Sequence, residues 1–171
     1  MTIRKAKKKD IEEIMRISAA AKETMRSRGN TVQWAGDYPS RDLWLDDIKK
    51  GQAYVVECDC DPVAAFALIF GDDPTYGYIE GGSWPNSRPY ATIHRVASDG
   101  SRHGIVTAVT EYCSGLASDL RADTHEINCV MRRELTKNGF IRCGTIYLPD
   151  GTPRFAYHRI CNNDSTEEIN E

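Results

Sequence analysis

The chain has 171 residues, of which 40% are hydrophobic and 27% are charged, a composition that excludes a fibrous or largely disordered protein. Its 22 basic and 25 acidic residues give a net charge of -3, which argues against a nucleic-acid partner. A chain of this length forms one domain, and it buries enough surface to hold a core without disulfides or a metal.

The N-terminal segment carries no apolar run of signal-peptide length, and no stretch approaches the roughly 20 apolar residues that span a bilayer. We therefore expect a cytoplasmic protein with no membrane partner and with reduced thiols. The spacings of the six cysteines match no zinc site, so no metal is expected. Cys58 and Cys60 are interpreted as thiols beside a hairpin turn.

A strand and two helices are predicted at the start of the chain. The strand covers residues 2–5, and the apolar residues that follow recur at helical spacing. Asp10 can cap the start of this first helix, and Gly29 can end it. A second helix is predicted over 41–50, because Ser40 can cap its start and lysines follow at its end, as the helix dipole favours.

Two strands and a long loop come next. The strands cover 53–58 and 63–70, and the turn between them is expected at 61–62. Residues 71–89 are rich in glycine and proline, which predicts a loop with at most one short strand, at 76–80.

The second half of the chain alternates strands and helices. In order, it predicts a strand over 90–98, a helix over 102–116, a strand over 120–124, a helix over 127–138 and strands over 140–148 and 154–160. This order allows a parallel strand pair, so we expect one α/β (α+β) domain over 1–161, with a mixed sheet of about seven strands and about four helices. The acidic tail, 162–171, is expected to be disordered.

The segment 98–104 has the properties of an anion-binding loop, because it lies between a predicted strand and an amphipathic helix. Consecutive backbone N–H groups at a helix N-terminus attract anions. Gly100 and Gly104 permit close backbone approach, while Arg102 and His103 add donors. The alternative is that the two glycines only shape the turn between strand and helix.

Two blocks of sequence carry a resemblance to a known family. The first is 93–105. The second is 120–125, followed by Asn128, Met131, Leu135, Asn138, Gly139, Phe140 and Gly144. With these blocks, residues 2–160 resemble the GNAT superfamily of N-acetyltransferases. The resemblance implies a single GNAT-type domain that moves an acetyl group from acetyl-CoA, its co-substrate, to a primary amine of a small molecule or a peptide.

The resemblance also implies how acetyl-CoA is bound. The residues that match the family's diphosphate loop are Ser101, Arg102, His103, Gly104, Ile105 and Val106. Only Gly104 matches the usual pattern, Gln/Arg-x-x-Gly-x-Gly/Ala, outright. Main-chain groups of Val96, Ala97 and Ser98 would bind the pantetheine arm, and Asn128 matches an asparagine that contacts it. The alternative for Asn128 is an ordinary residue at a helix start.

His94 is the candidate general base for acetyl transfer. Some members of the family carry a catalytic histidine here, and the ordinary pKa of histidine, about 6.5, suits proton transfer. In a regular strand His94 and Val96 would point to the same face. The alternative for His94 is a packed or hydrogen-bonded strand residue. Glu80 is a second candidate base, and His125 could contact the acceptor or the cofactor.

The family's usual general acid, a tyrosine, is replaced here by Leu135, so an acid would come from elsewhere, with Tyr147 and Tyr157 as options. Among the tryptophans, Trp44 is expected in the core, whereas Trp34 and Trp84 are candidates for the acceptor site.

Direct transfer in a ternary complex is favoured, because no cysteine occupies a position where the family would use a covalent nucleophile. The rival hypothesis is a GNAT-like module that binds CoA or another ligand without turnover. Exposed final strands would permit a homodimer.

Overall fold

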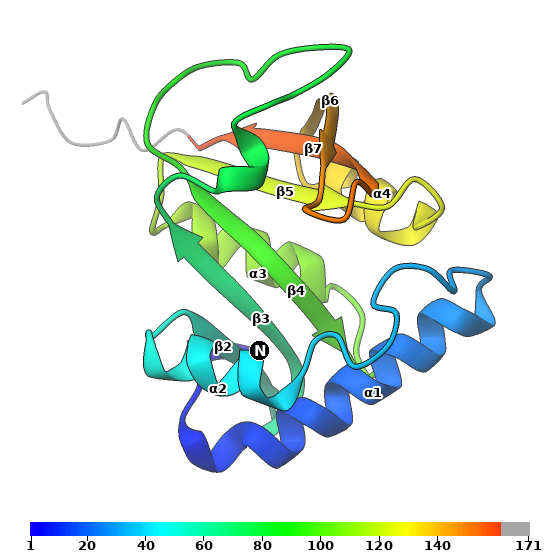
Figure 1. Cartoon of the computed structure of the whole chain (residues 1–171). Helices are drawn as coiled ribbons and strands as arrows, with labels where there is room; N and C mark the ends of the chain where they lie inside the picture. The colour runs from blue at the N-terminus through cyan, green and yellow to red at the C-terminus, as the bar shows by residue number, and fades with distance from the viewer. Residues whose placement is uncertain (162–171) are drawn as a thin grey trace, which may run out of the picture.

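A computed structural model of the chain describes residues 1–161, which fold around one seven-stranded sheet. In spatial order the strands are β1 (Thr2–Lys5), β2 (Ala53–Cys58), β3 (Asp61–Phe70), β4 (Ala91–Ser98), β5 (Asp119–Thr124), β7 (Pro153–Ile160) and β6 (Ile141–Tyr147). Among these strands of the described residues, only β4 and β5 run parallel, as the strand–helix–strand order allows. The expected fold class is confirmed (Figure 1).

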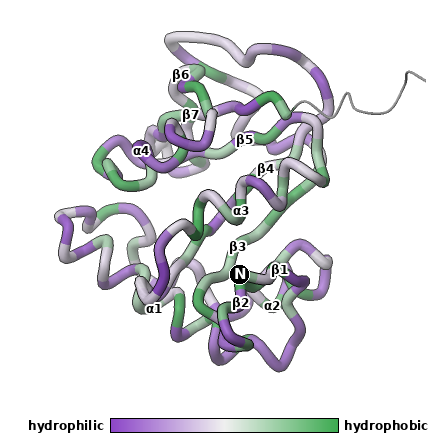
Figure 2. Tube along the Cα trace, turned by 180° about the vertical axis from the view of Figure 1, so that it is seen from behind, coloured by the Kyte–Doolittle hydropathy of each residue, from purple (hydrophilic) through white to green (hydrophobic). Residues whose placement is uncertain are grey.

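Within residues 1–161, four α-helices cover the two faces of the sheet: α1 (Ile11–Ser27), α2 (Arg41–Lys49), α3 (Ile105–Ser114) and α4 (Cys129–Lys137). Side chains alternate along β2, so Val55 packs under α1 and α2, whereas Tyr54 and Val56 belong to the core that α3 and α4 cover. Figure 1 shows α1 and α2 on the near face, and Figure 2, seen from behind, shows α3 crossing β3 and β4.

Three local expectations are corrected. The β2–β3 turn lies at Asp59 and Cys60, which adopt φ values of 54° and 71° as two-residue hairpins require, and not at 61–62. Helix α3 begins at Ile105 and not at residue 102, because Gly104 is left-handed. Residues 76–80 form no strand: a 3₁₀ turn covers Pro74–Tyr76, and a single bridge follows.

Two irregularities of β4 shape the site. First, β4 pairs with β5 only at Ala91 and Thr92, after which the strands separate, as Figure 1 shows. Second, the pairing of β4 with β3 shifts at Arg95, whose φ is 54°, so this residue forms a β-bulge. The main-chain groups of β4 beyond Thr92 therefore face an opening on the β5 side.

None of the helices within residues 1–161 combines the length and the apolar composition that crossing a membrane requires. The tail expected to be disordered, 162–171, lies outside the described residues.

Candidate active site

A cavity of about 820 Å³ opens where β4 and β5 separate. Its walls come from β4, β5, α3 and α4, and also from the α1–α2, β3–β4 and β6–β7 connections. Val96, Val106 and Met131 give it an apolar wall toward α3 and α4, whereas the loops contribute charged groups such as Asp73 and Arg154. Such a mixed, concave site suits a small-molecule ligand.

The bulge in β4 changes which side chains share a face. His94 and Ala97 lie opposite Ala67 and Ala65, two β3 residues that share one face of the sheet. Val96 instead packs against the core under α3. The expectation that His94 and Val96 point to the same face is therefore wrong, because the bulged residue between them breaks the alternation. Both residues still line the cavity.

His94 is held by an acidic partner from the β3–β4 loop. Its Nε2 lies 2.9 Å from Asp73 Oδ2, and each side chain is 19% exposed. Thr75 donates to the same carboxylate from its backbone N–H at 2.9 Å and from its hydroxyl at 2.6 Å. Burial raises the pKa of Asp73, but the hydrogen bonds from His94 and Thr75 outweigh it and lower that pKa to about 2. The carboxylate is ionised at neutral pH, so it accepts a hydrogen bond from the Nε2–H of His94.

Replacing Asp73 with asparagine should destabilise the fold by about 2 kcal/mol at pH 7. The folded-state pKa of Asp73 is about 2, below its ordinary value of 3.8, so the stabilisation is complete above that ordinary value and disappears as pH falls through about 2. Urea unfolding of the wild type and Asp73→Asn at pH 7, 5, 3 and 2 measures it. The exposed neighbour Asp72→Asn is the control, and a deficit that stays constant down to pH 2 would contradict the prediction.

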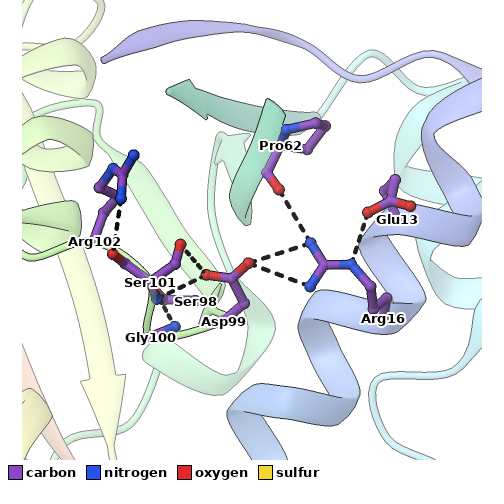
Figure 3. A network of polar contacts seen from close by, with 8 residues as sticks. All are labelled: Glu13, Arg16, Pro62, Ser98, Asp99, Gly100, Ser101 and Arg102. Atoms are coloured by element: carbon purple, nitrogen blue, oxygen red, sulfur yellow. Dashed lines mark hydrogen bonds and ion pairs between the residues drawn. The ribbon is translucent and has the colours of Figure 1, made fainter. Parts of the chain in front are cut away.

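The loop between β4 and α3 is shaped by a carboxylate (Figure 3). Asp99 Oδ1 accepts from the N–H of Ser101 at 3.0 Å and from its hydroxyl at 2.6 Å. Arg16 of α1 pairs with the other oxygen of Asp99 at 3.2 Å. Arg102 turns away to the β2–β3 hairpin, where it contacts Cys58 Sγ at 3.1 Å. The side chains of Ser101 and Arg102 are thus held by the protein itself.

The N-terminus of α3 is left with backbone donors only. Gly104 precedes the helix with φ 78° and provides no side-chain cap. The first N–H groups of a helix have no partner within it, and they carry its positive dipole end. The anion site predicted from the sequence would therefore act through the amides at Ile105 and Val106, whereas the side chain of Ile105 is buried in the core. His103 is exposed beside this loop.

Gly104→Ala should weaken acetyl-CoA binding about 10-fold and destabilise the fold by about 1 kcal/mol, because a left-handed φ strains alanine. The added methyl meets no protein atom within 4 Å, so it would project into the open space in front of the helix. Gly81→Ala is a matched control, since it has φ 70° and equally open surroundings but lies outside the loop between β4 and α3. Calorimetric titration measures the affinities, and equal losses in both variants would contradict the prediction.

Asn128 has a structural partner at each end of its side chain. Its Oδ1 accepts from the N–H of Met131 and caps α4, as the alternative interpretation expected. Its Nδ2 donates to Gln33 Oε1 at 3.0 Å, and Thr124 donates to the same oxygen at 3.3 Å. Gln33 thus fastens the α1–α2 loop to the β5 side of the cavity. Of the other expected cofactor residues, Val96 and Val106 line the cavity, whereas Ala97 packs against Ile17 and Ser98 accepts from Gly100.

The remaining candidates divide into cavity residues and others. His125 and Trp34 line the cavity, and so does Leu135 at the family's usual tyrosine position. Trp84 does not line the cavity, because its ring packs on Tyr76. The structure therefore does not place Trp84 in the acceptor site, where it was a candidate. Trp44 is fully buried, as predicted.

The other proposed base and the two tyrosines lie away from the cavity. The hydroxyl of exposed Tyr147 donates a hydrogen bond to Glu80 Oε2, and neither residue lines the cavity. Tyr157 is buried in the core. These positions support His94 over Glu80 as the proton acceptor.

Several residues of the site gave no functional signal in the sequence. Asp73 and Thr75 read as turn residues, and Gln33 and Arg154 come from a loop and a strand with no recognisable functional motif. Only the expected alternation of the last strand, which gives 154, 156 and 158 a common face, could have pointed to Arg154.

No protein-family model and no curated protein matches the chain. Several solved structures, however, match it over nearly its whole length. A GNAT-family acetyltransferase from Streptococcus agalactiae matches with a TM-score of 0.83 and 32% identity, covering 98% of this chain and 96% of that one. GNAT-family acetyltransferases from Listeria monocytogenes (TM-score 0.68, 16% identity, 93% and 94% covered) and Bacillus cereus (0.62, 17%, 93% and 96%) share the fold.

These likenesses define an acetyltransferase fold. Because the identity to the streptococcal protein reaches 32% over nearly the whole chain, the protein belongs to the GNAT family and is an N-acetyltransferase. Acetyltransferases of this family use acetyl-CoA as co-substrate. The residues present fit that molecule, since the separated edge of β4 offers main-chain groups to amides and the start of α3 offers donors to a diphosphate.

Proposed function

We propose that the protein moves an acetyl group from acetyl-CoA to a primary amine by direct transfer in a ternary complex, with His94 as general base. The observation that carries this proposal is the His94–Asp73 pair in the wall of the cavity between β4 and β5. An ionised Asp73 keeps the proton of His94 on Nε2, which leaves Nδ1 as the nitrogen that takes a proton from the amine.

The donor would occupy the apolar side of the cavity. Acetyl-CoA supplies the thioester, and the free main-chain edge of β4 near Val96 and Ala97 would bind its pantetheine amides and polarise its carbonyl. Amides at the start of α3 would hold its diphosphate. The acceptor would enter from the side of the α1–α2, β3–β4 and β6–β7 connections, in the cavity that Trp34 and His94 both line.

Direct transfer is supported by the positions of the thiols. A covalent acetyl-enzyme would need a nucleophile in the site, and none of the six cysteines is among the residues that line the cavity. The cytoplasmic setting and a homodimer stay predictions from the sequence.

Titration with acetyl-CoA, followed by measurement of CoA release across a panel of amines, tests the proposed function. Saturable binding and amine-dependent CoA release are expected, with initial-rate lines that intersect when both substrates are varied. Parallel lines would contradict direct transfer. Tight binding without release to any amine would favour the binding module, and absence of acetyl-CoA binding would overturn the proposed function.

A further inference from the structure

Arg154, at the start of β7, is a buried cation without an ionic partner. It is only 8% exposed, yet within residues 1–161 it makes no ion pair, and its one hydrogen bond goes to the carbonyl of neighbouring Pro153. None of its nitrogens is both fully buried and without a hydrogen-bond partner in the described part of the chain. The residue also lines the cavity. Its unused N–H groups therefore open onto the cavity.

The other cationic side chains of the cavity are already neutralised or neutral. Arg95 pairs with Asp47 at 2.7 Å, and His94 pairs with Asp73. Burial and the charge of Arg154 lower the pKa of His125, which favours its neutral form. Arg154 is thus the one cation lining the described cavity that has no carboxylate of its own, and keeping it buried costs free energy that a bound anion would offset.

The acidic side chains near Arg154 accept hydrogen bonds from other residues. Asp123 accepts one from the hydroxyl of Tyr76 at 2.7 Å, and Asp150 accepts from the N–H and the hydroxyl of Thr152. Both carboxylates attract Arg154, but neither reaches ion-pair distance in the structure. Their negative charge remains in the cavity wall, where it favours an ammonium group.

These charges lie close to the proposed base. The ring of Tyr76, which donates to Asp123, lies 6.3 Å from the ring of His94. The lining of this one cavity therefore includes an unpaired guanidinium, a carboxylate and the His94–Asp73 pair. A zwitterion matches these charges better than a simple diamine, which would leave Arg154 unpaired.

From these contacts we infer that the acceptor is an amino acid, whose carboxylate binds Arg154 while its amino group faces Asp123 and His94. The inference rests on the proposed function and specifies its acceptor. A planar guanidinium binds a carboxylate through two parallel hydrogen bonds, so the interaction sets the distance between the bound carboxylate and the reacting amine.

The experiment compares kcat/KM for amino acids and for the amines that lack only the carboxylate. The matched pairs are L-phenylalanine with 2-phenylethylamine, L-leucine with 3-methylbutylamine, and L-methionine with 3-(methylthio)propylamine. Wild-type protein should prefer the amino acid of at least one pair. Arg154→Gln should lower kcat/KM for that amino acid by at least about 30-fold and leave that for its matched amine nearly unchanged.

Two variants guard against a merely structural effect. Arg154→Lys keeps the charge and should therefore retain part of the preference. It should not retain all of it, because a lysine cannot bind the carboxylate through two parallel bonds. Arg133→Gln, an exposed substitution away from the cavity, should leave the ratio unchanged. Unaltered acetyl-CoA affinity in the Arg154 variants confirms that they are folded.

The outcomes separate the two proposals. Release of CoA with the matched amines but not with the amino acids, or equal losses for both in Arg154→Gln, would overturn the amino-acid acceptor and leave the proposed transfer intact. If acetyl-CoA binds but no member of the panel turns over, calorimetric titration of the CoA-saturated protein with the amino acids decides. Absence of amino-acid binding there overturns the inference, and absence of acetyl-CoA binding overturns the proposed function itself.

Discussion

His94→Gln should lower kcat by about 10²- to 10⁴-fold, the usual contribution of a positioned general base. Glutamine keeps a polar side chain beside Asp73 but has no nitrogen that takes up a proton at neutral pH. Steady-state CoA release between pH 5 and pH 9 measures the effect.

The same variant should bind acetyl-CoA as the wild type does, because the proposed donor contacts are main-chain groups of β4 and α3. An unchanged rate and pH profile would remove His94 as base. A loss of acetyl-CoA affinity equal to the loss of rate would instead identify a residue that shapes the donor site.

Trp44→Ala should destabilise the fold by about 3 to 5 kcal/mol. The side chain is fully buried, its Nε1 donates to Ser18 Oγ at 3.1 Å, and it fills the space between α1, α2 and the sheet. Removal of so large a side chain leaves a cavity and an unpaired buried hydroxyl. Urea unfolding at neutral pH measures the free energy of unfolding.

Trp34→Ala is the matched control, because this tryptophan is only partly buried and lines the cavity. It should change the KM of the acceptor and cost much less stability than the loss of Trp44. Similar destabilisation by the two substitutions would contradict the assignment of Trp44 to the core and Trp34 to the site.

The sequence was sufficient for the elements whose signals are local. Ser40 caps α2 through a 3.2 Å hydrogen bond from the N–H of Leu43, as its residue type predicted. The apolar run of β3 and the alternation of β4 likewise placed these strands correctly, because burial in the sheet selects apolar side chains along a strand. The candidate diphosphate loop was predicted for the same reason, since glycines beside a helix start leave a local pattern.

The chemistry of the site depends on contacts that no local pattern records. His94 meets Asp73 only because the β3–β4 loop folds back over the sheet, 21 residues away along the chain. The bulge at Arg95 reverses the facing of its neighbours, and nothing in the residue types announces a positive φ there. Arg102, expected to serve the anion site, turns to Cys58 because the β2–β3 hairpin lies within its reach.

The bulge has a consequence for how substitutions in this protein would be classified. Arg95 extends from the bulge to pair with Asp47 of α2 at 2.7 Å, and its guanidinium lies 5.9 Å from the ring of Trp44. The backbone that presents His94 is therefore anchored by a helix that takes no part in the proposed chemistry. A genetic screen for lost acetylation would recover substitutions in α2 as well as in the cavity. Only unfolding measurements would distinguish variants that lose stability from variants that lose catalytic activity.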